Sequence, residues 1–287
     1  MDDPYLIGLI GRGIGPSLSP ALHEREARRL GLRLRYRLID IDELGVGADA
    51  AGDLVRKARA RGYGGLNVTH PCKQTVVPAL DELSPVAAEL GAVNTVTFDG
   101  TRAVGHNTDV TGFGRAFARG LPGARLRTVV QLGAGGAGAA VAHATLELGA
   151  ARLIVIDAVP ARAAALASGL NRRFGAGRAE AGEPSGLAAA LADADGLVHA
   201  TPTGMAEHPG LPLPAALLRT DLWVAEVVYR PLETELLRTA RAAGCRTLDG
   251  GGMVVYQAAD AFRLFTGVEP DPDRMLGHFT DLIASGV

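Results

Sequence analysis

The chain has 287 residues, of which 47% are hydrophobic and 21% charged, an ordinary balance for a protein of one or two globular domains. Its net charge of −2 gives no electrostatic reason to expect nucleic acid or an anionic membrane as a partner. Two cysteines, Cys72 and Cys245, are too few for a disulfide framework or a thiolate zinc site. The sequence shows neither a signal peptide nor a long apolar run, so we expect a cytoplasmic protein with no membrane contact.

Strands and helices alternate along the first part of the chain. The apolar run at 5–11 predicts a buried strand, and the segment 19–32 begins with Ser-Pro and stops near a glycine, as helices do. Further strands are predicted at 35–41, 62–69, 92–99 and 102–109, and further helices at 51–62 and 75–83. This alternation predicts a mostly parallel α/β sheet.

The same pattern starts again at residue 128. A strand, a glycine turn and a helix are predicted over 128–150, followed by a strand at 152–158 and a helix at 161–174. Further strands are predicted at 196–204, 222–229 and 245–252, and the chain then reads as helical, with the last helix at 273–283. We therefore expect two α/β domains with a boundary near residue 110, while the pattern leaves the attachment of the C-terminal helices open.

A glycine-rich turn follows the apolar strand "TVVQL" and opens a helix of small residues. Gly133, Gly135 and Gly138 form G-x-G-x-x-G, with an additional glycine at Gly136. In this context the first glycine permits a tight turn, the second lets the backbone approach a pyrophosphate, and the third lets helix and strand pack closely. The motif predicts a dinucleotide site; the alternative is a plain glycine turn.

An acidic residue ends the next predicted strand. Asp157 lies 19 residues beyond Gly138, where a carboxylate accepts hydrogen bonds from the ribose hydroxyls and repels a 2′-phosphate. Ala158 and Val159 offer no cation to hold such a phosphate, although Arg162 lies one helical turn further on. The sequence therefore predicts NAD rather than NADP as the cofactor.

Polar residues follow four predicted strands of the first half. They are Ser17 and Ser19 after the first strand, the stretch 67–73, then Asn94 with Thr95, and finally 107–109. Ligands of open α/β sheets bind beyond the carboxyl ends of strands, so these hydroxyls and amides suit a small polyol or hydroxy acid. The alternative for each cluster is helix capping and turn formation.

Oxidation of an alcohol by a nicotinamide also requires removal of the hydroxyl proton. No metal-ligand spacing is present, so we expect no metal site and predict that Lys73, oriented by Asp109, carries the proton. The alternative is a solvated loop lysine.

The whole chain resembles the shikimate/quinate dehydrogenase family. The resemblance rests on "SLSPALH" at 17–23, "NVTHPCK" at 67–73, "GAVNT" at 91–95, "GHNTD" at 105–109, "GAGGAG" at 133–138, "ATPTGM" at 200–205, "YRPLET" at 229–234 and "MVVYQAADAF" at 253–262. It implies a substrate-binding domain at 1–110, an NAD-binding Rossmann domain at 111–250, and C-terminal helices at 251–287 that pack back on the first domain.

The resemblance also implies roles for individual residues. Ser17 and Ser19 would hold the substrate carboxylate, with Tyr229 near it, and Lys73 and Asp109 would form the catalytic pair. The ring hydroxyls would be bound by Asn67, Thr69, Asn94, Asp109 and Gln257. The cofactor would be lined by Gly133, Ala134, Gly135, Gly136, Ala137, Gly138, Asp157, Val227 and Gly250.

Three positions depart from the family pattern. NADP-using members have Asn-Arg-Thr where this chain has Asp157-Ala158-Val159, which again favours NAD. The usual Asn before "ATP" is His199, for which we expect a hydrogen-bonding role in the core, and the commoner Asp before the tyrosine motif is Glu226, a change we expect to be tolerated. These features resemble the NAD-dependent quinate/shikimate branch most.

The function implied is reversible oxidation of shikimate to 3-dehydroshikimate with NAD, and quinate is expected as a second substrate. NAD preference fits quinate catabolism, whereas the family also serves aromatic amino acid biosynthesis, so the physiological direction stays open. Alternatives are an aminoshikimate-type substrate, a cofactor-sensing binding protein without turnover, and a metal-dependent alcohol dehydrogenase. A monomer or a homodimer is expected.

Overall fold

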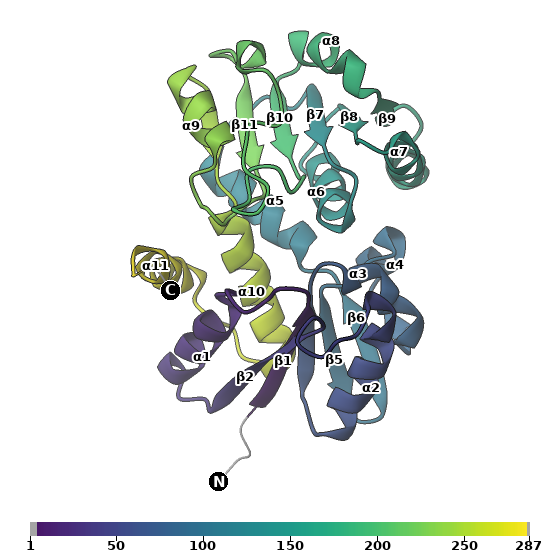
Figure 1. Ribbon diagram of the computed structural model, residues 1–287, viewed down its shortest axis with the longest axis vertical. Coiled ribbons are helices and arrows are strands. Elements are labelled where there is room, and N and C mark those ends of the chain that lie inside the picture. Colours follow the sequence, from purple (N-terminus) through teal and green to yellow (C-terminus); the bar gives the residue numbers. More distant parts are fainter. Residues whose placement is uncertain (1–4, 286–287) are drawn as a thin grey trace. The chain divides into compact units, whose positions relative to one another are not determined.

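The computed structural model describes residues 5–285, which form two compact units (Figure 1). The first unit runs to Thr108 and resumes at Val255, and the second unit is Asp109–Val254. Each unit is built on one six-stranded sheet with helices packed against it. The predicted fold class, a two-domain α/β protein whose C-terminal helices return to the first domain, is confirmed. Which ligand each unit binds stays a prediction at this point.

The first unit has a mixed sheet in the order β2-β1-β3-β5-β6-β4. Its strands are β1 (Tyr5–Gly11), β2 (Leu34–Asp40), β3 (Gly65–Val68), β4 (Glu82–Leu83), β5 (Thr95–Asp99) and β6 (Arg102–His106). Its helices are α1 (Ser19–Arg29), α2 (Ala51–Ala60), α3 (Cys72–Thr75), α4 (Pro85–Leu90), the second part of α10 (Gly251–Thr266) and α11 (Pro272–Ala284). Short 3-10 turns lie at η1 (Ala48–Ala50) and η2 (Val77–Ala79).

The strands of this sheet differ in burial according to their position. Strand β1 pairs in parallel with both β2 and β3 and is buried along most of its length, as expected for a central strand with helices on both faces. Strand β2 lies at the edge, where Leu34 and Tyr36 are buried while Arg35 and Arg37 are exposed. Strand β5 runs antiparallel to β3 and β6, so the sheet is mixed, with parallel pairs among β2, β1 and β3 on one side of β5 and between β6 and β4 on the other.

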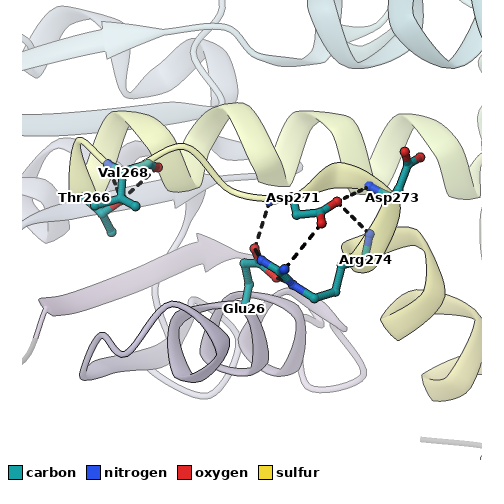
Figure 2. Close-up of polar contacts among 6 residues, drawn as sticks. All are labelled: Glu26, Thr266, Val268, Asp271, Asp273 and Arg274. Carbon is teal, nitrogen blue, oxygen red and sulfur yellow. Dashed lines mark hydrogen bonds and ion pairs between the residues drawn. The ribbon is translucent and has the colours of Figure 1, made fainter.

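The C-terminal helices are part of the first unit's core. Phe262 and Phe265 of α10 belong to the same buried cluster as Ile7 of β1 and Tyr36 of β2. Helix α11 is joined to α1 by a carboxylate, because Glu26 accepts hydrogen bonds from the Asp271 N–H at 2.9 Å and from Arg274 Nε at 2.9 Å (Figure 2). The second guanidinium nitrogen of Arg274 lies 2.5 Å from Glu26 Oε1.

The second unit has an all-parallel sheet in the order β12-β11-β10-β7-β8-β9. Its strands are β7 (Thr128–Leu132), β8 (Arg152–Ile156), β9 (Ala179–Gly182), β10 (Gly196–His199), β11 (Trp223–Glu226) and β12 (Arg246–Leu248). Its helices are α5 (Asp109–Gly120), α6 (Gly136–Glu147), α7 (Pro160–Phe174), α8 (Leu187–Ala192), α9 (Glu235–Ala242) and the start of α10, with 3-10 turns η3 (Pro184–Gly186) and η4 (Ala215–Leu217).

The order of these strands places a switch point between β7 and β10. Successive strands extend outward in one direction from β7 through β8 to β9, and in the other direction from β10 through β11 to β12. This is the doubly wound Rossmann order, in which dinucleotides bind in the crevice at the carboxyl ends of the strands where the order reverses. The turn after β7 therefore occupies the expected binding position.

The helix predicted at 75–83 is wrong. The structure has α3 and η2 there instead, followed by the two-residue strand β4. Pro78 lies within this segment, and proline has no N–H to donate and disfavours helix in the residue before it. A separate helix, α4, starts after Ser84, whose hydroxyl accepts a hydrogen bond from the N–H of Ala87 and caps the helix. The sequence prediction also missed β9 and α8.

None of the helices within residues 5–285 is both long enough and apolar enough to span a membrane.

Candidate functional site

A buried hydrogen-bond network lies at the ends of three strands of the first unit. Asn67 of β3 donates from Nδ2 to Asn94 O at 3.2 Å and to Thr95 Oγ1 at 3.1 Å. Its Oδ1 accepts from the Tyr36 hydroxyl at 2.8 Å. Asn94 Oδ1 accepts from the Thr108 N–H at 2.8 Å, and Asn94 Nδ2 lies 2.9 Å from Thr108 Oγ1. The network fixes both amide groups in orientation before any ligand binds.

The C-terminal helix α10 adds one more predicted residue to this network. Gln257 Oε1 lies 3.5 Å from Asn94 Nδ2, although the two residues are 163 positions apart in the chain. The structure therefore brings Asn67, Asn94 and Gln257 together within the first unit. Sequence reasoning missed Tyr36 as the partner that orients Asn67, because a tyrosine in a strand is usually read as a packing residue.

Lys73 and Thr69 lie beyond the end of β3. The Thr69 N–H donates to Ile10 O at 2.9 Å, and the half-buried Lys73 belongs to α3, where its carbonyl accepts from the Val93 N–H at 2.8 Å. Asp109 follows Thr108 directly in the chain and is the first residue of α5, so it opens the second unit. The pairing of Lys73 with Asp109 stays a prediction.

The pKa shifts of His70 and Cys72, the two other reactive side chains of this stretch, favour their neutral forms. Burial and the positive charges of Arg12 and Lys73 lower the pKa of His70. Burial raises the pKa of the Cys72 thiol, which is inaccessible in the core of the first unit. Because the thiolate is the nucleophilic form, Cys72 is unsuited to covalent catalysis. Among residues 5–285, no three histidine, cysteine or carboxylate side chains gather as a metal site requires.

The loop that carries the two serines is held by the carboxylate of Asp40, at the end of β2. Asp40 accepts from the Gly13 N–H at 3.1 Å and from the Ile14 N–H at 2.8 Å. The Ser17 N–H in turn donates to Ile14 O at 2.9 Å, and the Ser17 hydroxyl oxygen accepts from the Ser19 N–H at 3.3 Å. Asp40 thereby fixes the position of both predicted carboxylate-binding hydroxyls, a role that sequence reasoning missed.

Asp40→Asn should lower the free energy of unfolding of the first unit by about 2 kcal/mol at pH 7, because two charge-assisted hydrogen bonds are weakened. Burial raises the pKa of Asp40, but the N–H groups of Ile14, Asp42 and Gly13, with the charge of Arg12, outweigh it and hold the pKa below its ordinary value. A lowered folded-state pKa stabilises the protein above the unfolded value of about 3.9 and loses that effect as the pH falls through the folded pKa. Urea unfolding at a series of pH values from neutral to acidic measures the free energy of unfolding and its dependence on pH.

The matched control is Asp42→Asn, two residues along the chain. Asp42 forms an exposed ion pair with Arg12, and such pairs contribute at most about 0.5 kcal/mol. We expect the difference between wild type and Asp40→Asn to be constant above about pH 5 and to shrink below about pH 4. The role of Asp40 would be contradicted if Asp40→Asn lowered the free energy of unfolding as little as Asp42→Asn does. It would also be contradicted if the loss in Asp40→Asn did not depend on pH.

In the second unit, the glycines of the loop after β7 are needed for three different reasons. Gly133 has a φ of +102°, and a Cβ there would lie 2.4 Å from Ala200 O. A Cβ on Gly138 would lie 2.3 Å from Gly133 O, so only glycine lets α6 pack against the loop. Gly135 is exposed, and its Cβ would point into open space. The first and third glycines thus allow the tight turn and the close packing of α6, while the second leaves the backbone accessible from solvent. This arrangement fits a pyrophosphate that approaches the backbone at Gly135.

A glutamine inside the preceding strand holds the glycine loop in shape. Gln131 is fully buried, and its Nε2 donates to Gly133 O and to Gly138 O, each at 2.8 Å. Two carbonyls of the loop are therefore turned inward, away from the place where phosphate oxygens would lie. Sequence reasoning missed this residue, although a lone polar residue within the apolar strand "TVVQL" was a visible signal.

Asp157 lies directly after β8 and is bound to the same loop. Its Oδ2 accepts from the Ala134 N–H at 2.7 Å, and its Oδ1 accepts from the Val159 N–H at 2.8 Å. The side chains at 158 and 159 are exposed and uncharged. The carboxylate is thus fixed beside the glycine loop with no cation in the two following residues.

The remaining predicted cofactor residues lie at the ends of β11 and β12. A Cβ on Gly250 would lie 2.5 Å from Val227 O, so these two segments touch through their backbones. Tyr229 follows two residues after Val227 and is half-buried. The roles of Val227, Gly250 and Tyr229 in ligand binding stay predictions.

His199, at the end of β10, is fully buried and hydrogen-bonded through both ring nitrogens. Its Nδ1 lies 2.8 Å from Glu226 Oε1, and its Nε2 lies 2.5 Å from Thr201 Oγ1. The prediction of a hydrogen-bonding histidine in the core is confirmed.

The all-parallel sheet of the second unit has a G-x-G-x-x-G loop at its switch point and a carboxylate after the neighbouring strand. These features are typical of the dinucleotide-binding domain of an oxidoreductase.

Comparison with known proteins specifies the family. Models of the shikimate dehydrogenase substrate binding domain and of the shikimate 5'-dehydrogenase C-terminal domain match residues 9–96 and 250–277. A shikimate dehydrogenase (NADP(+)) of Streptomyces avermitilis is 72% identical over 98% of this chain and 96% of its own length. A quinate/shikimate dehydrogenase (NAD(+)) of Corynebacterium efficiens is 50% identical over 98% of this chain and 99% of its own length. The chain belongs to the shikimate dehydrogenase family.

Solved structures agree with this assignment. A quinate dehydrogenase of Corynebacterium glutamicum in complex with NAD is 49% identical, with a TM-score of 0.91 over 98% of this chain and 100% of that chain. A shikimate 5-dehydrogenase of Listeria monocytogenes in complex with shikimate and NAD is 33% identical, with a TM-score of 0.84 over 95% of each chain.

Proposed function

We propose that the protein is an NAD-dependent shikimate dehydrogenase that also accepts quinate. The reaction would be shikimate + NAD⁺ ⇌ 3-dehydroshikimate + NADH + H⁺, with oxidation at the ring C3 hydroxyl. The observation that carries the NAD assignment is the carboxylate of Asp157, fixed beside the glycine loop by its bonds to the N–H groups of Ala134 and Val159. Quinate as a second substrate rests on the Corynebacterium efficiens relative, which is named for both acids, and on the solved structure named a quinate dehydrogenase.

The named preferences of relatives point in both directions. The Streptomyces avermitilis relative is named for NADP(+), whereas the Corynebacterium efficiens relative is named for NAD(+). Overall identity therefore does not decide between the cofactors, and the proposal of NAD rests on the local charge. A 2′-phosphate placed next to the Asp157 carboxylate would be repelled, and residues 158 and 159 provide no positive charge to compensate.

The first unit's residues would bind and orient the ring acid. Ser17 and Ser19 would hold its carboxylate, while Asn67 and Gln257 would bind ring hydroxyls. Both N–H groups of the Asn67 amide are used inside the protein, and its oxygen already accepts from Tyr36, so Asn67 has one lone pair left for a hydroxyl. Asn67 would therefore act as a hydrogen-bond acceptor that fixes the position of a single hydroxyl group.

Proton transfer is assigned to Lys73. In the oxidation the Lys73 amine takes the proton of the C3 hydroxyl, and in the reduction the ammonium returns it. Asp109 would orient Lys73, as the resemblance to the family implies. When bound, NAD supplies the hydride acceptor, and the residues of the chain keep the reacting hydroxyl in place.

The test of the proposed function is a steady-state matrix of NAD and NADP against shikimate and quinate. We expect turnover of both acids with NAD and a kcat/KM for NAD at least about tenfold above that for NADP. No turnover of either acid with either cofactor, despite cofactor binding, would favour a binding protein without catalysis. Turnover of shikimate alone would remove quinate from the proposal.

Asp157→Asn should reduce or reverse this cofactor preference. The amide keeps an oxygen for the Ala134 N–H but removes the negative charge, so kcat/KM for NADP should rise and that for NAD should fall by about tenfold. Asp193→Asn, at an exposed position just after α8 in the same unit, is the matched control and should change neither value. An unchanged ratio in Asp157→Asn would mean that the cofactor is selected elsewhere.

A further inference from the structure

Two of the three departures from the family pattern, His199 and Glu226, contact each other. His199 and Glu226 are direct neighbours in the register of β10 and β11, and both side chains are buried. The His199 Nδ1 and Glu226 Oε1 atoms are 2.8 Å apart. Two changes that are far apart in the sequence are therefore one hydrogen-bonded pair in the fold.

Each member of the pair also holds the loop that follows its own strand. His199 Nε2 hydrogen-bonds with Thr201 Oγ1, which accepts the Thr203 N–H at 3.3 Å and so shapes the loop 200–205. Glu226 Oε1 accepts from the Val228 N–H at 3.0 Å, and its Oε2 accepts from the Thr234 hydroxyl at 3.0 Å, at the two ends of the loop 227–234. The pair thus connects the two loops through four side-chain contacts.

Both loops lie where the dinucleotide would bind. The loop 200–205 begins with Ala200, whose carbonyl oxygen lies so close to Gly133 of the glycine loop that a Cβ there would be 2.4 Å away. The loop 227–234 begins with Val227, whose carbonyl oxygen would lie 2.5 Å from a Cβ on Gly250. They follow β10 and β11, in the half of the sheet opposite to β8 and Asp157. In a doubly wound sheet each half binds one mononucleotide, so these loops serve the half that does not carry the adenosine ribose.

We propose that His199 and Glu226 are positioning residues that set the spacing of these two loops and thereby the affinity for the nicotinamide half of the cofactor. The inference uses the proposed function only in taking the ligand to be a nicotinamide dinucleotide. Neither residue needs to touch the cofactor. A buried histidine–carboxylate pair is costly to disrupt on one side only, because the remaining group loses its partner in a place without water.

The experiment compares two ligands on the same variants. NADH contains both halves of the cofactor, whereas ADP-ribose lacks the nicotinamide. His199→Asn and Glu226→Gln should each raise the dissociation constant for NADH about tenfold and change that for ADP-ribose less than about twofold. The KM for NAD should rise with the NADH constant, and kcat at saturating NAD should change by less than about threefold.

The double variant tests whether the two residues act as one unit. If they do, the double variant His199→Asn/Glu226→Gln should raise the dissociation constant for NADH about tenfold, as the more strongly affected single variant does. Two independent tenfold effects would instead raise it about a hundredfold. Independent effects that multiply would contradict the pairing.

A matched control separates positioning from stability. His143 is also a buried histidine of the second unit bonded to a glutamate, since its Nε2 lies 3.2 Å from Glu147 Oε1 on α6. His143→Asn should lower the melting temperature and leave both dissociation constants unchanged. The inference is overturned if His199→Asn weakens NADH and ADP-ribose equally, or lowers only the melting temperature. These ratios hold for NADPH as well as NADH, so failure here is distinct from failure of the NAD assignment.

Discussion

Lys73→Met should lower kcat for shikimate oxidation by about a thousandfold, while KM for shikimate changes less than about threefold. Methionine has a similar length and fits a half-buried position, but it cannot accept or return a proton. General acid–base catalysis typically contributes between about 10² and 10⁴ to the rate, which sets the expected magnitude. Steady-state NADH formation at saturating NAD measures both parameters.

The chain offers a direct control, because its only other lysine is Lys57. Lys57 is exposed on α2 and should be replaceable by methionine without effect on kcat or KM. If Lys73→Met kept kcat within about tenfold of wild type, another group would have to carry the proton. In that case the fold and the dinucleotide loop would stand, and only the catalytic assignment would be lost.

The parts of the site that could be predicted from sequence are those in which residues of the required chemical type lie at a characteristic spacing within a short segment. The glycine loop is an example, because Gly133 and Gly138 have no room for a Cβ, whereas Gly135 has room for one and leaves the backbone accessible to a ligand. The positive φ of Gly133 and the contact of Gly138 with Gly133 are local features of the turn, so the glycine spacing in a single sequence reveals them.

The residues that hold the site were harder to find because their partners lie far away in the chain. Tyr36 orients Asn67 across 31 positions, and Asp40 holds Ile14 across 26. A tyrosine or an aspartate at a strand position is read from sequence as a packing or turn residue, and only strand order places it next to its partner. The resemblance named His199 and Glu226 as separate departures, and the pairing of β10 with β11 joins them.

The error at 75–83 has a local cause. The predicted helix ran through Pro78, whereas in the structure this proline lies in a 3-10 turn. The real start signal, Ser84 followed by Pro85, lay just beyond the predicted helix. The predicted range therefore missed a helix start that the capping residues mark correctly.

Glu26→Ala should lower the free energy of unfolding of the first unit by about 3 kcal/mol, because it removes the buried carboxylate that joins α1 to α11. Glu26 is fully buried and accepts three hydrogen bonds, one from the Asp271 N–H and two from the guanidinium of Arg274. Figure 2 shows these three residues together. Without the carboxylate these donors lose their partner. Urea unfolding, with hydrogen exchange of the α1 and α11 amides, measures the loss.

The same two helices supply the control. Arg25 of α1 and Asp281 of α11 form an ion pair at 2.9 Å whose members are 36% and 62% exposed. Exposed pairs contribute little, so Asp281→Asn should cost less than about 0.5 kcal/mol across the same helix contact. If Glu26→Ala and Asp281→Asn lowered the free energy of unfolding by equally small amounts, the attachment of α11 would rest on apolar packing alone. If Glu26→Ala alone also raised KM for shikimate, the buried carboxylate would be supporting Gln257 through the C-terminal helices, since α10 carries Gln257 to Asn94 and α11 follows α10.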